Sequence, residues 1–166
     1  MADTDVVLAG ANPAVLLRDG DQAAAFASLW LVDWSERGAG RVLFVVEPDA
    51  TRMYGERREL ADWLADTFVR RFGESARVGW HEPEWVPARP EVLLDTSAGL
   101  TATAADVTLT LAGVGPPARF AGDALGYHLS NVTFPCTAAR LTRSGSTVTG
   151  TPDPAFLALA EVWSRP

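Results

Sequence analysis

The second half of the chain is a series of short runs rich in Thr, Val and Leu, separated by Gly, Pro, Asp or Ser. β-Branched runs bounded by such turn formers are typical of antiparallel strands. This pattern constrains the fold most, because it predicts an antiparallel sheet for nearly half of the molecule. The predicted strands are residues 91–96, 100–103, 107–112, 126–134, 138–143 and 147–151.

The first half has a different pattern, in which predicted strands and helices alternate. Two segments have apolar residues at helical spacing and glycine at their ends, so we predict helices over residues 21–37 and 55–72. The stripe of the first helix contains Phe26, Leu29, Trp30 and Trp34. Short apolar runs predict strands at residues 5–10, 41–47 and 77–80.

The end of the chain reads as a last helix. Asp153 is a candidate cap, Pro154 fits the first turn, and apolar residues up to Trp163 follow at helical spacing. The expected fold is therefore α+β, with an N-terminal strand-helix-strand-helix-strand half packed against C-terminal antiparallel strands and a terminal helix. We expect residues 1–166 to form a single domain, with a possible internal boundary near residues 83–90.

Composition excludes several classes of partner and compartment. Asp and Glu number 21 against 14 for Lys plus Arg, which argues against nucleic acid and anionic membranes as partners. A single cysteine and the lack of a leader or an apolar span favour the cytoplasm. The absence of isoleucine and lysine is typical of a GC-rich bacterial source, and nothing in the sequence indicates an oligomeric state.

Motifs for cofactors and metals are also missing. The chain has no phosphate-binding loop, no dinucleotide fingerprint and no G-x-S-x-G nucleophile elbow. Its two histidines and one cysteine, Cys136, do not have the spacing of metal ligands. We therefore expect a metal-free protein without a cofactor.

The densest polar and aromatic cluster is the segment Trp80, His81, Glu82, Pro83, Glu84 and Trp85. Histidine is the side chain whose unperturbed pKa lies near neutrality, so His81 is the leading acid–base candidate, with Glu82 or Glu84 to orient it and Trp80 or Trp85 to form the pocket wall. The alternative is a proline-stiffened connection whose charges are solvated.

Two further sets of candidates come from periodicity. Polar residues fall on both faces of the strand around His128, which suits a cavity wall with Tyr127 and Asn131 as ligand contacts, or a solvated edge strand. Asp33 interrupts the apolar stripe of the first predicted helix, next to Trp34. We predict that Asp33 is buried with a partner or a raised pKa, or pairs with Arg37, and that Trp34 lies in the core or a pocket wall.

Three functions fit these features. The first is a cofactor-independent bacterial enzyme that acts on a small, largely apolar molecule by isomerisation, cyclisation or elimination, with Asp33, His81 and His128 around one cavity. The second is a non-catalytic module that binds a ligand or a protein. The third is a carbohydrate-active domain that uses Trp80 and Trp85 for stacking. Convergence of the three titratable residues would favour the enzyme, whereas their dispersal would favour the module.

Overall fold

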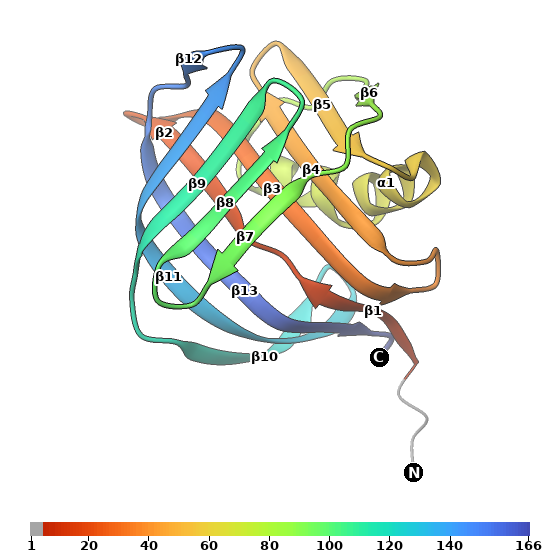
Figure 1. Cartoon of the computed structure of the whole chain (residues 1–166). Helices are drawn as coiled ribbons and strands as arrows, with labels where there is room; N and C mark the ends of the chain where they lie inside the picture. The colour runs from red at the N-terminus through yellow and green to blue at the C-terminus, as the bar shows by residue number, and fades with distance from the viewer. Residues whose placement is uncertain (1–4) are drawn as a thin grey trace.

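The computed structural model describes residues 5–166, and over these the chain is 63% strand with one helical segment of 18 residues (Figure 1). The expected α+β fold with several helices is therefore wrong. The helical segment consists of α1 (Arg58–Leu64), the π-helical turn η1 (Ala65–Val69) and α2 (Arg70–Ser75). The strands are β1 (Val6–Ala11), β2 (Ala14–Asp19), β3 (Gln22–Ser35), β4 (Gly40–Glu47), β5 (Ala50–Gly55), β6 (Glu84–Val86), β7 (Glu91–Asp95), β8 (Gly99–Ala104), β9 (Val107–Val114), β10 (Ala118–Ala124), β11 (Tyr127–Arg143), β12 (Ser146–Thr147) and β13 (Thr151–Ser164).

All strands belong to one sheet, whose main path runs β6-β5-β4-β3-β1-β13-β11-β9-β8-β7. β2 pairs with both β3 and β13, while β10 and β12 pair with β11. Only β5 and β6 are parallel. The sheet folds over, so that β7, β8 and β9 lie in front of β3 and β4, and the helix covers the opposite face of β3 and β4 (Figure 1).

This arrangement produces two hydrophobic cores. The sandwich core lies between the two halves of the folded sheet and is mainly aliphatic; it includes Val15, Ala27, Leu43, Leu109 and Leu157. The helix-side core lies between the helix and the sheet and is rich in aromatic rings; it includes Phe26, Trp30, Phe44, Phe68 and Trp163. Strands β3 and β4 contribute to both cores, so they are covered on both faces.

The predicted helix over residues 21–37 is wrong, because this segment forms β3. Between residues 25 and 32, even-numbered residues such as Trp30 face the helix-side core, while odd-numbered residues such as Leu29 face the sandwich core. Burial on both faces makes the sequence continuously apolar, and such a run does not distinguish a strand from a helix by period. Its many alanines also favour helix locally, and tertiary packing overrides that preference.

The predicted last helix is also wrong, since the segment forms β13, which pairs with β1, β2 and β11. Pro152 and the residues after it lie at an irregularity in the pairing with β2, where a proline costs no ladder hydrogen bond. No strand forms at residues 77–80. The predictions also missed β2, β5, β6 and β10, whereas the helix expected over residues 55–72 is confirmed with shifted ends.

The two halves of the folded sheet are joined by a buried ion pair. Glu47, at the end of β4, accepts hydrogen bonds from Arg143 Nε (2.6 Å) and Nη2 (3.1 Å) at the end of β11. Tyr54 donates to Asp106 across the same layers at 3.4 Å. Burial raises the pKa of Tyr54 to about 12, so the phenol stays protonated as the donor.

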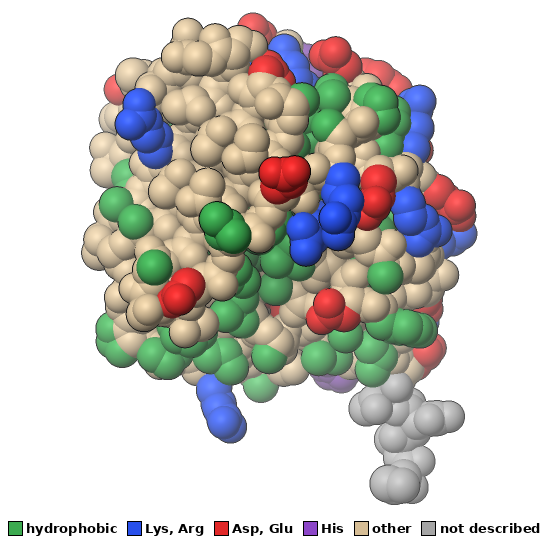
Figure 2. Space-filling view, in the orientation of Figure 1, with side chains coloured by type: hydrophobic (Ala, Val, Ile, Leu, Met, Phe, Trp, Pro, Cys, Tyr) green, Lys and Arg blue, Asp and Glu red, His purple; other side chains and the backbone are tan. Residues whose placement is uncertain are grey.

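Charged side chains are unevenly distributed over the surface. On the face that Figure 2 shows, acidic and basic side chains gather beside one another at the right, while hydrophobic side chains line the lower rim. Among residues 5–166, no helix has both the length and the apolar character needed to cross a membrane.

Candidate ligand-binding site

An apolar pocket of about 180 Å³ opens between the C-terminal half of the helix and the sheet. Three phenylalanines from three different elements form its walls: Phe26 of β3, Phe72 of α2 and Phe156 of β13. We call this the helix-side pocket, and its other lining residues are Asn12, Ala14, Val15, Leu16, Ala76 and Pro154. Asn12 is the only one with a polar side chain, so the pocket is suited to an apolar group.

Asn12 is 6% exposed and presents a hydrogen-bond acceptor. Its Nδ2 donates to Leu29 O and to Ser28 Oγ, both at 2.9 Å. A carbonyl such as Leu29 O only accepts, which fixes the nitrogen of the amide toward β3. No hydrogen bond to the Oδ1 atom is found among the described residues, and because Asn12 lines the pocket, a ligand or water can bind this acceptor.

The order of residues along β2 explains why the pocket forms there. Side chains alternate along a strand, so Ala14 and Leu16 face the helix, in line with Asn12 just before β2. Small Ala14 leaves space, whereas Leu16 and its partner Phe26 form a wall. The helix closes the other side with Phe72 and Ala76.

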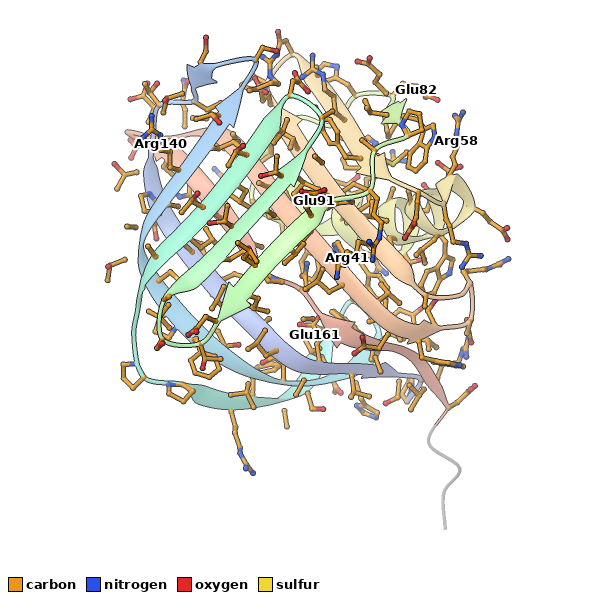
Figure 3. All side chains as sticks on the ribbon, in the orientation of Figure 1. Arg41, Arg58, Glu82, Glu91, Arg140 and Glu161 are labelled. Atoms are coloured by element: carbon orange, nitrogen blue, oxygen red, sulfur yellow. The ribbon has the colours of Figure 1, made fainter. Side chains whose placement is uncertain are left out.

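A buried carboxyl lies on the same face of the sheet. Glu161 of β13 is 2% exposed; its Oε1 accepts from Trp163 Nε1 at 2.6 Å, and its Oε2 accepts from Asn131 Nδ2 at 3.3 Å. Burial raises the pKa of Glu161 to about 7, and the two hydrogen bonds only partly oppose this shift. Figure 3 shows Glu161 between the ribbons of β13 and β1, whereas Glu82, Arg58 and Arg140 lie at the rim.

A β-bulge turns Glu161 inward. Between the pairs Ser130 with Val162 and Val132 with Leu159, β11 has one residue and β13 has two. The extra residue, Ala160, has a φ of 48°, and it shifts the alternation so that Glu161 and Trp163 face the helix. Opposite Glu161 on β1 is Gly10, where a Cβ atom would lie 2.0 Å from Leu31 O. Only glycine fits this close approach of β1 to β3.

An aromatic cluster connects the pocket with Glu161. Phe72, which lines the pocket, lies 6.1 Å from Trp163 between ring centroids, and Trp163 also contacts Phe68 at 4.5 Å. Phe68 in turn stacks on Trp30 at 5.1 Å. The indole N–H of Trp30 is buried and has no acceptor among the described residues. The helix-side core therefore contains a free acceptor, a free donor and a carboxyl that can hold a proton at neutral pH.

The three titratable residues predicted around one cavity lie apart. His81 is exposed, and its Nε2 donates to Pro48 O at 2.7 Å, at the border of a separate polar pocket that Pro48 lines. His128 is exposed and pairs with Asp123 across the β10–β11 hairpin. Asp33 is exposed on β3, so its predicted burial is wrong. The prediction assumed a helix, and helical spacing places Asp33 on the apolar face. In the strand β3 that the segment forms, the Asp33 side chain is exposed to solvent.

The carboxylates predicted to assist His81 are also at the surface. Glu82 and Glu84 are both exposed, and Glu84 lies 3.5 Å from Arg52 Nε. Among the predicted ligand contacts, Trp34 is 51% exposed, because the pairing of β3 with β1 shifts at Asp33 and this bulge turns Trp34 away from the face on which Trp30 lies. Trp80 and Trp85 are half-buried and pack on the helix-side core.

Two of the predicted contacts lie beside Glu161. Tyr127 packs on Trp163 with a centroid distance of 6.2 Å, and Asn131 binds the Glu161 carboxyl. Sequence reasoning missed Glu161, Asn12 and Phe156 as site residues. The signal for Glu161 was its spacing of two from Trp163, which places both on one face of a strand, but the segment was read as a helix.

Comparison with protein-family models, curated proteins and solved structures finds no match to this chain. Within residues 5–166, no three His, Cys, Asp or Glu side chains come together in a group that could hold a metal ion. The helix-side pocket and the polar groups beside it are the features from which a function can be argued.

Proposed function

We propose that the protein binds a small apolar molecule that carries a hydrogen-bond donor, such as a phenol, in the helix-side pocket. The observation that supports this most directly is an almost wholly apolar pocket with one unpartnered acceptor, Asn12 Oδ1. The dispersal of Asp33, His81 and His128 favours a binding module over an enzyme built on those residues. We keep the cytoplasm as the expected location, since the single cysteine, Cys136, is a free thiol.

The size of the pocket limits the ligand to about one ring. An apolar cavity of roughly 150 Å³ in an engineered protein stays dry and binds benzene. The helix-side pocket, at about 180 Å³, has room for a six-membered ring with one small substituent. The rings of Phe26, Phe72 and Phe156 offer aromatic contacts to such a ligand.

Asn12 adds selectivity to this apolar site. A ligand hydroxyl that donates to Oδ1 satisfies an atom that otherwise has no partner among the described residues. A ligand that can only accept would leave two acceptors facing each other. The pocket should therefore prefer phenol to toluene, which has no donor, and to anisole, which only accepts.

Binding of these three molecules can be measured by two-dimensional NMR titration of the ¹⁵N-labelled protein. We expect shifts confined to the pocket, with phenol bound about ten-fold more tightly than toluene and more tightly than anisole. Ala76→Leu should abolish these shifts, because it fills the pocket from the helix end. Ser75→Leu is the matched control, since the preceding residue lines the neighbouring polar pocket only. Equal binding to the wild type and Ala76→Leu would contradict the proposal.

An acid–base enzyme for isomerisation, cyclisation or elimination is the second candidate, and Glu161 is the observation that favours it. A carboxyl with a pKa of about 7 can give or accept a proton at neutral pH. If a bound ligand is turned over, Glu161→Gln should abolish turnover while binding persists. The competing acid–base group is His81, for which His81→Ala should leave folding intact and cut turnover about 10²-fold. Turnover that survives both substitutions would exclude these two groups.

A further inference from the structure

A second, polar pocket of about 580 Å³ adjoins the helix-side pocket. Ala76, at the end of the helix, lines both, so the two pockets share a wall at this residue. The polar pocket is lined by Arg18, Asp21, Gln22, Ala23, Pro48, Ser75, Ala76, Arg77, Val78 and Gly79. An apolar compartment and a cationic one therefore lie next to each other at the same end of the helix.

The two compartments follow one another along β2. Ala14 and Leu16 line the helix-side pocket, and Arg18, the next residue on that face, lines the polar pocket. Alternate residues of a strand are about 7 Å apart. The distance from Leu16 to Arg18 is therefore similar to the length of one aromatic ring with a short substituent. The paired residues on β3 follow the same order. Phe26, the partner of Leu16, lines the helix-side pocket, and Ala23, the partner of Arg18, lines the polar pocket.

The charges in the polar pocket favour an anion. Arg77 is exposed and makes no ion pair among residues 5–166. Its φ of 59° places it in the left-handed turn that ends the helix. Arg18 lies 3.6 Å from Asp153, but that carboxylate is largely exposed, and such a surface pair contributes little. Asp21 is the only carboxylate that lines the pocket, so two guanidinium groups outnumber it.

The end of the helix does not oppose an anion strongly. The negative end of a helix dipole comes from carbonyl groups without partners. Here Phe72 O, Gly73 O and Glu74 O accept hydrogen bonds from the backbone N–H groups of Ala76, Val78 and Arg77, respectively. These bonds satisfy part of the last turn and leave the two arginines as the dominant charges.

We infer that the ligand is a small aryl alkanoate with a ring hydroxyl, whose carboxylate is bound by Arg18 and Arg77. This inference rests on the proposed function, because it places the ring in the helix-side pocket with its hydroxyl on Asn12 Oδ1. The alkyl tail passes Ala76 and brings the carboxylate into the polar pocket, where guanidinium groups form charge-assisted hydrogen bonds. A ring that begins beside Leu16, together with a tail of two or three methylene groups, is long enough to bring the carboxylate to Arg18.

Three matched ligands test this: 3-(4-hydroxyphenyl)propionate, its primary amide and 4-ethylphenol. Their dissociation constants can be measured by NMR titration or calorimetry at low ionic strength. We expect the carboxylate to bind at least about ten-fold more tightly than the amide, which has nearly the same shape and no charge. We also expect 4-(4-hydroxyphenyl)butyrate to bind as well as the propionate, and 4-hydroxybenzoate to bind more weakly than both.

The double variant Arg18→Gln/Arg77→Gln should bring the carboxylate and the amide to equal affinity and leave 4-ethylphenol unchanged. Arg119→Gln/Arg140→Gln is the matched control, because it also removes two positive charges, from exposed positions on β10 and β11. If the wild-type protein does not bind 4-ethylphenol, the proposed function itself is overturned. Binding of 4-ethylphenol with no preference for the carboxylate, or a preference that survives the double variant, would overturn only this inference.

Discussion

The two cores of this protein are built from the same strands but differ in composition. The sandwich core is aliphatic, with many alanine, valine and leucine side chains, and the Glu47–Arg143 ion pair lies where the two halves of the sheet meet. The helix-side core is aromatic and contains Glu161 and the unpartnered indole N–H of Trp30. It also borders the pocket that Asn12 lines.

This difference indicates that the two cores serve different purposes. An unsatisfied buried donor and a buried carboxyl each lower the free energy of unfolding, and protein interiors generally avoid them. The side chains of the sandwich core are mainly aliphatic, so this core supplies stability; beside it, the buried Glu47 is paired with Arg143, and Arg52 Nη1, 3.8 Å from Glu47, has no hydrogen bond among the described residues. The helix-side core gives up part of that stability, and Asn12 at its border lines the pocket that we propose as the ligand site.

The largest effect should come from removing the central ring of the helix-side core. Phe68→Ala should lower the free energy of unfolding by about 3 to 5 kcal/mol, because Phe68 contacts the rings of Trp30, Trp63, Tyr127 and Trp163. Chemical denaturation measures the change. In the sandwich core, Leu109→Ala should cost about 2 to 5 kcal/mol.

The two substitutions should differ in their effect on ligands. Phe68→Ala loosens the helix above the pocket and should weaken phenol binding, whereas Leu109→Ala should leave the affinity of the folded fraction unchanged. An equal loss of affinity in both variants would show that the two cores are not functionally distinct.

The next effect is the dependence of stability on pH. The pKa of Glu161 is about 7 in the folded protein and 4.5 in the unfolded chain, so the folded state binds more protons between these values. The free energy of unfolding should therefore fall as pH rises from 4.5 through 7. With 1.36 kcal/mol for each unit of pKa, the loss attributable to Glu161 is about 3 kcal/mol.

Comparison with Glu161→Gln isolates this contribution from that of other carboxyl groups. The variant should be less sensitive to pH between 5 and 8, and relatively more stable at pH 8, as measured by urea denaturation across the range. Parallel curves for the wild type and the variant would contradict a raised pKa at Glu161.

A smaller effect should follow from breaking the ion pair between the sheet halves. Arg143→Ala leaves Glu47 buried at 8% exposure with Arg52 Nη1 3.8 Å away as its remaining cation. We expect a loss of roughly 2 kcal/mol, below that of a fully buried pair because Arg143 is partly exposed. Replacing both residues, as Glu47→Leu/Arg143→Leu, should cost less than the single change. A larger loss in the double variant would mean that the pair itself stabilises the fold.

In the second half, strands β7, β8, β9 and β11 could be predicted from the sequence because one face of each is more exposed than the other, whereas β10 and β13 were not predicted. In β8 and β9 the buried residues alternate with more exposed ones, so the period of two is visible. The helix at α1 could be predicted for the same reason, since its outer face is charged. β3 and most of β13 lack a solvated face. Apolar residues therefore occur at nearly every position, and the sequence does not show the two-residue period of a strand.

The candidate site could be predicted only in part. Tyr127 and Asn131 were identified because polar residues interrupt a strand pattern, and both lie beside Glu161. Glu161 itself depends on the bulge at Ala160, a backbone irregularity that no propensity scale contains. Asn12 depends on β2 pairing with β3 and β13, a long-range arrangement that the local pattern does not specify.

The position of β13 has a consequence for how the chain folds. β13 follows the other strands of the sheet in the sequence, yet it pairs with β1, β2 and β11 in the middle of the sheet. Until it emerges, those three strands have open edges, which are prone to aggregate. The ladder between β1 and β13 pairs Val6 with Ser164, and closing so long a loop makes folding slow. In a nascent chain the sheet therefore stays incomplete, with edges that need protection, until β13 has left the ribosome.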